Sequence, residues 1–274
     1  MERLQRDGAL LEFMASGVGE PVLLIHPSVT ADGLSIPLLQ RRELASSYRV
    51  LTYHRRGYRN STLGPQPVSM VDQAADAAAV LDHLGVRRAH VVGHSYGGVV
   101  ALQLAHDQPR LVHSLALLEP PLMAVSSGPA LRERTLIPAA QRYRSGDKHG
   151  GLDLFLTEVF GSGWRSALDA AVPGGVSQAE ADVDTVFTVD LPSLQRWTFC
   201  DELVATPSCP ILSVVGRDSP PFRFEGRQLL HQWFPHTEDF DLENANHLLQ
   251  MKNPEGMALG LSAFFQRHPI NRAN

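Results

Sequence analysis

The sequence predicts an α/β protein with a mostly parallel, twisted sheet that helices cover on both faces. Short apolar runs alternate along the chain with longer stretches in which apolar residues recur near the helical period. The short runs are continuously apolar rather than alternating, as expected of parallel strands buried on both faces. With 274 residues, of which 43% are hydrophobic, the chain is long enough to bury one large core.

Six segments have the length and composition of strands. The five apolar ones are residues 21–26 (PVLLIH), 49–53 (RVLTY), 89–93 (AHVVG), 114–118 (SLALL) and 210–215 (PILSVV), and the half-polar one is 237–242 (TEDFDL). Parallel strands need right-handed crossovers, so the segments between them should place helices on both faces. Ligands of such sheets bind at the carboxyl ends of the strands.

Three further segments predict helices around the sheet, at residues 68–84, 96–106 and 254–267. In the first, apolar residues from Val71 to Leu81 recur near a period of 3.6, and Gly85 follows as a C-cap. Pro109 closes the second, and Pro254 suits the first turn of the third.

The region from residue 120 to 206 interrupts the alternation, because it contains helical patterns but no strong strand. It begins just after the carboxyl end of a strand. We therefore expect residues 1–119 and 207–274 to form the core domain and residues 120–206 to form a helical lid inserted over the strand ends. The alternative is that these helices simply pack on the sheet.

Composition narrows the classes of function. The net charge is about −5, and no basic run is longer than the stretch from His54 to Arg56, so we expect no nucleic-acid partner. No window approaches 18 apolar residues, and the charged first 11 residues lack a signal-peptide core, so we expect a cytoplasmic protein without a membrane partner. Cys200 and Cys209 are expected to be free thiols. A monomer and a homodimer both remain open.

The most informative stretch is Gly93-His94-Ser95-Tyr96-Gly97, a G-x-S-x-G pattern between a predicted strand and a predicted helix. A tight turn at this junction would hold Ser95 in a strained conformation with its hydroxyl above the sheet edge. Glycines on either side let neighbouring backbone pass closely. The start of the following helix would place N–H groups and a positive dipole end near a reacting carbonyl. We therefore predict that Ser95 is a nucleophile.

These residues resemble the α/β-hydrolase superfamily, and specifically its serine-nucleophile, esterase- and lactonase-like members with a helical lid. Four segments occur in the family's order: residues 26–28 (HPS), 53–58 (YHRRGY), the turn at Ser95, and Asn246-His247. The resemblance implies the α/β-hydrolase fold and no metal or organic cofactor. The sequence also has no H-E-x-x-H or paired C-x-x-C spacing that would suggest a metal site.

The resemblance also implies roles for single residues. His247 would be the base that accepts the proton of Ser95. The backbone N–H groups of Ser28 and Tyr96 would form the oxyanion hole. The chain departs from the family at Pro27, where a glycine is usual, and proline has no N–H to donate.

The acid that would orient His247 has two candidates. The usual family position in the Gly216-Arg217-Asp218-Ser219 segment holds Ser219, and Asp218 comes one residue early. Relatives with a serine in this position resemble those that take their acid from the end of an earlier strand. In this chain Glu119 follows that earlier apolar strand. We favour Glu119, and Asp218 remains the alternative.

Candidate substrate-pocket residues are His26 in the first loop and aromatic side chains of the predicted lid. The aromatic candidates are Phe155, Phe160, Trp164, Phe187 and Trp197, each of which could instead belong to the lid core. We interpret His54 and His94 as structural residues, and His231 and His236 as surface residues.

The resulting hypothesis is a hydrolase of a carboxylic ester or lactone of a small, largely apolar substrate. Thioester hydrolysis and carbon–carbon bond hydrolysis would use the same three residues. A cofactor-free oxygenase or lyase, or a slow-turnover ligand-binding protein, remains open on the same scaffold because fold alone does not fix function.

Overall fold

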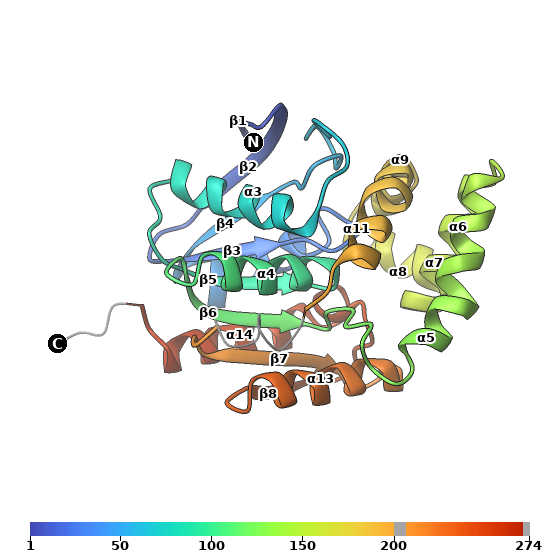
Figure 1. Cartoon of the computed structure of the whole chain (residues 1–274). Helices are drawn as coiled ribbons and strands as arrows, with labels where there is room; N and C mark the ends of the chain where they lie inside the picture. The colour runs from blue at the N-terminus through green and yellow to red at the C-terminus, as the bar shows by residue number, and fades with distance from the viewer. Residues whose placement is uncertain (200–206, 271–274) are drawn as a thin grey trace.

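One eight-stranded sheet organises the computed structural model, which describes residues 1–199 and 207–270. The strands are β1 (Glu2–Arg6), β2 (Ala9–Ser16), β3 (Glu20–Ile25), β4 (Tyr48–Tyr53), β5 (Ala89–His94), β6 (Val112–Leu118), β7 (Ile211–Gly216) and β8 (Glu238–Leu242). Their order is β1-β2-β4-β3-β5-β6-β7-β8, and β3 to β8 are parallel (Figure 1). The predicted mostly parallel sheet and all six predicted strands are confirmed.

Strands β1 and β2 were not predicted. They form an antiparallel hairpin at the edge of the sheet, and β2 also pairs antiparallel with β4. Strand β1 is largely exposed, so it has no apolar run. In β2, Leu11 and Phe13 are buried, but Glu12 between them is buried as well, so the sequence shows no clean alternation.

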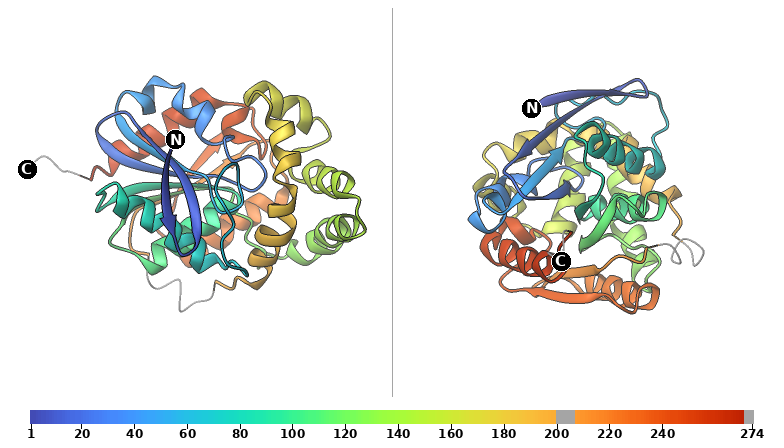
Figure 2. Two further views of the ribbon diagram at one scale, coloured as in Figure 1. Left: turned by 90° about the horizontal axis from the view of Figure 1, so that it is seen from above. Right: turned by 90° about the vertical axis from the view of Figure 1, so that its left-hand side faces the viewer.

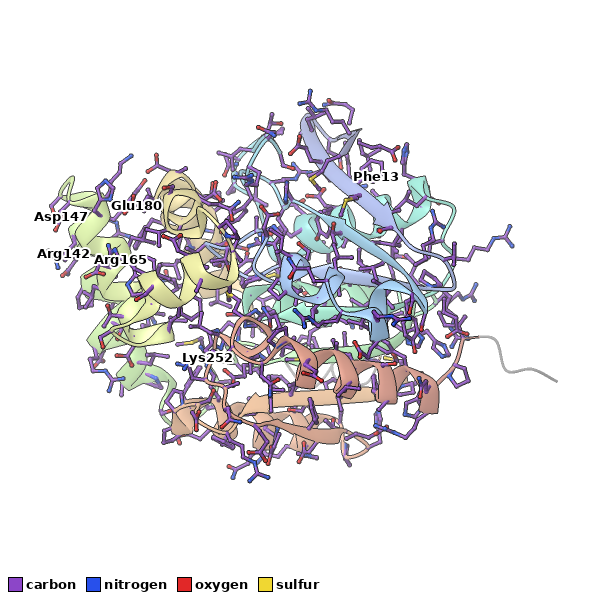
Figure 3. All side chains as sticks on the ribbon, turned by 180° about the vertical axis from the view of Figure 1, so that it is seen from behind. Phe13, Arg142, Asp147, Arg165, Glu180 and Lys252 are labelled. Carbon is purple, nitrogen blue, oxygen red and sulfur yellow. The ribbon has the colours of Figure 1, made fainter. Side chains whose placement is uncertain are left out.

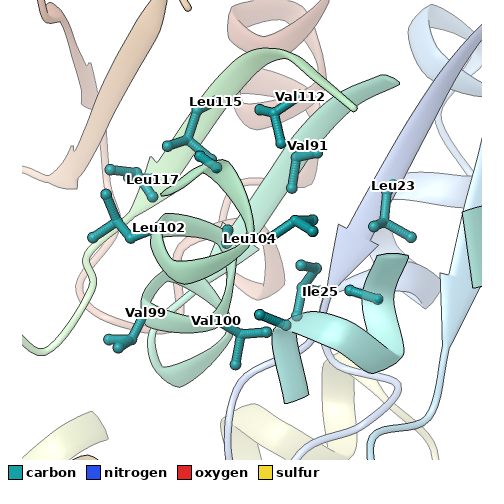
Figure 4. Close-up of a cluster of buried hydrophobic side chains, with 14 of the residues drawn as sticks. Leu23, Ile25, Val91, Val99, Val100, Leu102, Leu104, Val112, Leu115 and Leu117 are labelled. Atoms are coloured by element: carbon teal, nitrogen blue, oxygen red, sulfur yellow. The ribbon is translucent and has the colours of Figure 1, made fainter. Parts of the chain in front are cut away.

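Helices cover both faces of the sheet. Helices α3 (Met70–His83), α4 (Tyr96–Asp107) and α13 (Pro221–Trp233) contribute to one hydrophobic cluster, which Figure 4 shows around α4. Helices α1 (Ser35–Leu39), α2 (Arg42–Ala45) and α14 (Pro254–Arg267) contribute to the cluster on the other face. The two clusters enclose the parallel strands, as the continuous apolar runs predicted.

The buried face of α3 differs from the predicted one. Val71 is 54% exposed, whereas Met70, Ala74, Ala77 and Leu81 are buried. The side chain of Ser69 accepts from the N–H of Asp72, and the Asp72 side chain accepts from the N–H of Ser69, so a capping box starts the helix at Met70. Because alanine is nearly neutral in the apolar pattern, the two helix faces were indistinguishable in sequence.

A helical segment lies between β6 and β7, at the carboxyl ends of the parallel strands (Figures 1 and 2). It contains α5 (Gly128–Leu131), the π-helical turn η1 (Arg132–Leu136), α6 (Ile137–Arg144), α7 (Lys148–Phe160), α8 (Trp164–Ala171), α9 (Gly175–Ala181), α10 (Val183–Thr185), the π-helical turn η2 (Val186–Asp190) and α11 (Leu191–Arg196). We call this segment the helical insertion. Its designation as a lid stays a prediction.

The helical insertion has a hydrophobic core of its own. Leu152, Leu156, Trp164 and Leu168 are among its buried residues, and two residues of the sheet's loops, Val29 and Leu248, join the same cluster. Its outer side is charged, and Figure 3 labels Arg142 and Asp147 there, which form an ion pair. The insertion is therefore a packed layer over the strand ends.

Two remaining features concern the chain as a whole. No helix among the described residues combines the length and the apolar character needed to cross a bilayer. Cys209 is a free, half-buried thiol, and burial raises its pKa to about 11. Cys200 lies outside the described residues.

Candidate active site

Ser95 occupies a strained turn between β5 and α4. Its φ of 51° and ψ of −121° lie in a region that residues with a side chain seldom adopt. Close packing maintains the turn, since a Cβ on Gly93 would lie 2.3 Å from the Gly97 carbonyl oxygen and a Cβ on Gly97 would lie 2.1 Å from the Ile25 oxygen. The Ser95 N–H donates to the carbonyl of Leu118 on the neighbouring strand at 2.8 Å. Gly93 and Gly97 are therefore required, because a side chain at either position would collide with neighbouring backbone.

His247 follows β8 and lies against Ser95. Its Nε2 is 3.0 Å from Ser95 Oγ, and its Nδ1 is 2.5 Å from Glu119 Oε2. With the Nδ1 proton directed at the carboxylate, Nε2 accepts the hydroxyl proton of Ser95. The imidazole is buried, and His94 Nε2 contacts its backbone carbonyl at 3.1 Å. His94 thus supports this loop, in agreement with its structural interpretation.

Glu119 directly follows β6, and its side chain is fully buried. Its Oε1 accepts the N–H of Gly216 at 2.8 Å and the hydroxyl of Ser219 at 2.5 Å. Burial alone would raise the pKa of this carboxyl. The hydrogen bond from His247 and the nearby charges of His247 and Arg223 outweigh burial and lower the pKa to about 2. Glu119 is therefore ionised across the physiological range.

Asp218, the other candidate acid, is exposed, and its backbone N–H donates to the Ala245 carbonyl at 2.9 Å. The structure thus places Glu119, and not Asp218, against His247. Ser219 stands in the position where relatives have an acid and donates to Glu119 instead. The serine in that position and the glutamate one strand earlier belong to one hydrogen-bonded unit.

Burial also dominates the electrostatics of His247. It lowers the pKa of the imidazole, the charge of Arg223 lowers it further, and Glu119 opposes both, which leaves the pKa at about 4. The ring is therefore neutral at neutral pH and free to accept a proton.

Ser28 and Tyr96, whose peptide N–H groups are the expected oxyanion donors, line one cavity together with Ser95. Neither N–H group has a hydrogen-bond acceptor among the described residues. Tyr96 is the first residue of α4, where an N–H has no partner within the helix. Two unpaired donors beside a nucleophile can stabilise a developing oxyanion.

The loop that carries Ser28 is tied to the helical insertion by a buried ion pair. Ser28 Oγ donates to Asp190 Oδ2 at 2.6 Å, and Tyr58 donates to the same oxygen at 2.6 Å. Arg55 binds both carboxylate oxygens of Asp190 at 2.8 Å. Sequence analysis missed Arg55 and Asp190 as partners. The basic residue Arg55 was visible directly after a buried strand, but its partner lies 135 residues away.

A cavity of about 60 Å³ adjoins Ser95 beneath the helical insertion. Apolar side chains form most of its wall, including the predicted Phe155 and Phe160. Phe160 also stacks on the imidazole of His247, with ring centroids 5.7 Å apart. The polar lining outside the turn itself comes from Ser28, Thr135, Glu158 and Arg223.

Other predicted pocket residues lie away from this cavity. The rings of His26, Trp164 and Trp197 hydrogen-bond elsewhere, to Arg55 N–H, Asp153 and Gln103 respectively, and Phe187 stacks on Tyr143. Trp164 belongs to the core of the helical insertion. The expectation that these four residues line the Ser95 cavity is corrected. The ring nitrogens of His26, Trp164 and Trp197 find partners in the scaffold, and Trp197 lines a neighbouring pocket of about 120 Å³ instead.

The remaining histidines behave as the sequence suggested. His54 is buried between Glu12 and Asp32, at 3.3 and 3.0 Å. His231 and His236 make exposed contacts, to Asp239 and to the Cys209 carbonyl.

Comparison with known proteins points to one family. The model of the alpha/beta hydrolase fold matches residues 21–254. A non-heme haloperoxidase of Rhodococcus erythropolis is 30% identical over 212 residues, which is 69% of this chain and 75% of that protein. The candidate carbamate hydrolase RutD of Azorhizobium caulinodans is 34% identical over 108 residues, and the match spans only 40% of its length and 39% of this chain.

A solved structure agrees over nearly the whole chain. A thermophilic esterase from Thermogutta terrifontis aligns with a TM-score of 0.78, covering 98% of this chain and 100% of that one, at 23% identity. This likeness concerns the fold. Together with the match of the family model to most of the sequence, it establishes that the chain belongs to the α/β-hydrolase fold family.

Proposed function

We propose that this protein is a serine hydrolase that cleaves a carboxylic ester or lactone of a small, largely apolar substrate through an acyl-enzyme on Ser95. The observation that carries the proposal is the unbroken chain of contacts from Ser95 Oγ through His247 to Glu119, at 3.0 and 2.5 Å. The unpaired N–H groups of Ser28 and Tyr96 at the cavity support the same chemistry.

In the first step, Ser95 Oγ attacks the carbonyl carbon while His247 Nε2 takes its proton. Glu119 holds the Nδ1–H tautomer and stabilises the imidazolium that forms. The carbonyl oxygen becomes an oxyanion that the N–H groups of Ser28 and Tyr96 bind. His247 then protonates the departing alkoxide, and water cleaves the acyl-enzyme with His247 again as the base.

The relatives support acyl chemistry in general. The names of two of them refer to carbamate and ester hydrolysis, and both reactions begin with attack on a carbonyl carbon. The apolar wall of the cavity favours a largely apolar acyl or alcohol group. The helical insertion closes the cavity from above, so we propose that it acts as a lid that admits the substrate when it opens.

The nucleophile is tested by removing the hydroxyl. Wild-type protein should release p-nitrophenol from short acyl esters and bind a fluorophosphonate probe covalently, and Ser95→Ala should do neither. The exposed Ser166→Ala serves as the matched control and should behave like wild type. If wild-type protein neither labels nor hydrolyses any member of a panel of esters, lactones, thioesters and diketones, the proposal fails.

The acid is tested by comparing Glu119→Gln with Asp218→Asn. A glutamine NH₂ at position 119 would donate to Nδ1 and hold the wrong imidazole tautomer, so kcat should fall on the order of 10⁴-fold. Asp218→Asn should change kcat by less than about twofold, because surface changes away from such contacts have small effects. Steady-state kinetics on one ester measures both variants. The reverse order, or small and equal losses, contradicts the assignment.

The pH dependence follows from His247. Only the neutral imidazole accepts the Ser95 proton, and its pKa is lowered to about 4. As the pH falls, kcat/KM should therefore stay level below neutrality and reach half its plateau near pH 4, where the ring becomes protonated. Glu119, with a pKa of about 2, stays ionised throughout. A half-maximum near 6.5, the ordinary histidine value, in protein that remains folded by circular dichroism, contradicts this prediction.

The oxyanion loop is tested through Ser28 and Asp190. Ser28→Ala keeps the peptide N–H but removes the hydroxyl that contacts Asp190. We expect kcat to fall about tenfold with little change in KM, because one oxyanion donor is less well placed, although not removed. Asp190→Asn should lower kcat similarly, and the double variant should lose less than the product of both losses. An unchanged kcat in Ser28→Ala, or losses that multiply fully, contradicts the prediction.

A further inference from the structure

Arg223, near the start of α13, is the one cationic side chain among the described residues that line the Ser95 cavity. Its exposed fraction is 8%. It also lines an adjoining pocket of about 240 Å³, which shares Leu131, Glu158, Val159 and Phe222 with the cavity. Arg223 therefore lies where the two spaces meet, beneath the helical insertion.

The guanidinium of Arg223 has few partners for a buried cation. One Nη1–H donates to the backbone carbonyl of Glu119 at 3.2 Å. Its Nε lies 3.4 Å from Glu119 Oε2 but makes no hydrogen bond, and its Cζ lies 5.2 Å from the centroid of the Phe222 ring. A guanidinium can donate five hydrogen bonds, so most of its capacity is unused.

A second buried arginine in the same chain shows the contrast. Arg55 binds both oxygens of Asp190, and Gln73 and the Pro27 carbonyl accept further hydrogen bonds from it. No carboxylate binds Arg223 in this way. Glu119, the carboxylate nearest to it, is already engaged by His247, Ser219 and Gly216.

The other charge in the wall does not complete the pairing. Glu158 forms an ion pair with the exposed Arg134. A buried guanidinium that faces an apolar cavity with free N–H groups is suited to a planar oxyanion such as a carboxylate. Glu119 pairs with Arg223 through charge alone, without a hydrogen bond between the two side chains, and a substrate carboxylate could use the donors that remain.

An anion bound to Arg223 would also favour the proposed proton transfer. When His247 takes the proton of Ser95, Glu119 faces two cations, the imidazolium and Arg223. A carboxylate bound to Arg223 would leave Glu119 to stabilise the imidazolium alone. Such an anion would help binding and also the proton transfer.

We propose that Arg223 binds a carboxylate carried by the substrate, so that the preferred ester or lactone is an apolar molecule with one anionic end. The inference rests on the proposed serine-hydrolase function. It narrows the substrate class from neutral esters to esters that carry an acid group at a distance from the scissile carbonyl.

The experiment compares matched esters that differ only in this charge. On the acyl side, p-nitrophenyl monoesters of succinate, glutarate and adipate are paired with the same compounds capped as methyl esters. On the alcohol side, 4-acetoxybenzoate is paired with its methyl ester. After subtraction of uncatalysed hydrolysis, wild-type kcat/KM should favour the carboxylate by about tenfold or more in at least one pair.

Variants assign the preference to one side chain. Arg223→Gln should reduce the ratio of charged to neutral kcat/KM by about tenfold or more, and Arg223→Lys should retain part of it. The ratio within each variant cancels any effect that the substitution has on Glu119. Arg134→Gln removes the same charge from the exposed edge of the adjoining pocket and should leave the ratio within about twofold, since exposed charges are screened.

The outcomes separate the two proposals. Wild-type protein that hydrolyses the neutral esters at least as well as every charged partner overturns the role of Arg223 and leaves the serine hydrolase intact. This comparison stands even if Arg223→Gln does not fold. A charged-ester preference that survives in Arg223→Gln, or that Arg134→Gln removes equally, also overturns it. Absence of hydrolysis of every ester contradicts the proposed function itself.

Discussion

The buried carboxylate of Glu119 is the interaction on which the site depends. An unpaired charge with 0% of its side chain exposed would cost several kcal/mol, so partners must surround it. They come from the end of β7, from the loop after it, from Arg223 of α13 and from the loop after β8. Satisfying one charge therefore aligns the ends of three neighbouring strands, and His247 reaches Ser95 as a consequence.

A second buried carboxylate, Asp190, has the opposite character. Arg55, Tyr58 and Ser28 saturate its oxygens, and they connect the helical insertion to the loops after β3 and β4. Its ion pair is complete within the chain, whereas the pair of Glu119 and Arg223 leaves donors unused. The contrast distinguishes a charge that holds the scaffold together from one that remains available to a ligand.

This arrangement also fixes one end of the helical insertion to the core. The end that carries η2 is fixed to the core through Asp190, and Val29 and Leu248 continue the contact with apolar side chains. The part that lines the cavity, from α5 to α7, meets the core through fewer polar contacts, such as that of Asn246 with the Phe160 carbonyl.

The sequence predicted the strands and the turn that depend on interactions between residues close together in the chain. The continuous apolar runs identified β3 to β7, and a half-polar run identified β8. The spacing of Gly93, Ser95 and Gly97 identified a turn that only glycines allow. The hairpin β1–β2 was invisible because an exposed edge strand needs no apolar pattern.

Contacts between distant residues set the other limit of prediction. The sequence showed Ser219 where the family usually has an acid. It did not show that Ser219 donates a hydrogen bond to Glu119, because the two residues are 100 positions apart. Trp164 and Trp197 looked like pocket residues because aromatic character does not say which face of a helical layer a ring occupies. Their indole partners, Asp153 and Gln103, placed both rings in the scaffold.

The central claim is that the reaction proceeds through a covalent bond to Ser95. Rapid-quench mass spectrometry during hydrolysis of a p-nitrophenyl ester tests it most directly. The account predicts a transient mass increase equal to one acyl group, located to the peptide that contains Ser95. Two results would contradict it. One is a burst of p-nitrophenol followed by steady turnover, with no adduct at any time after mixing. The other is an adduct on a residue other than Ser95.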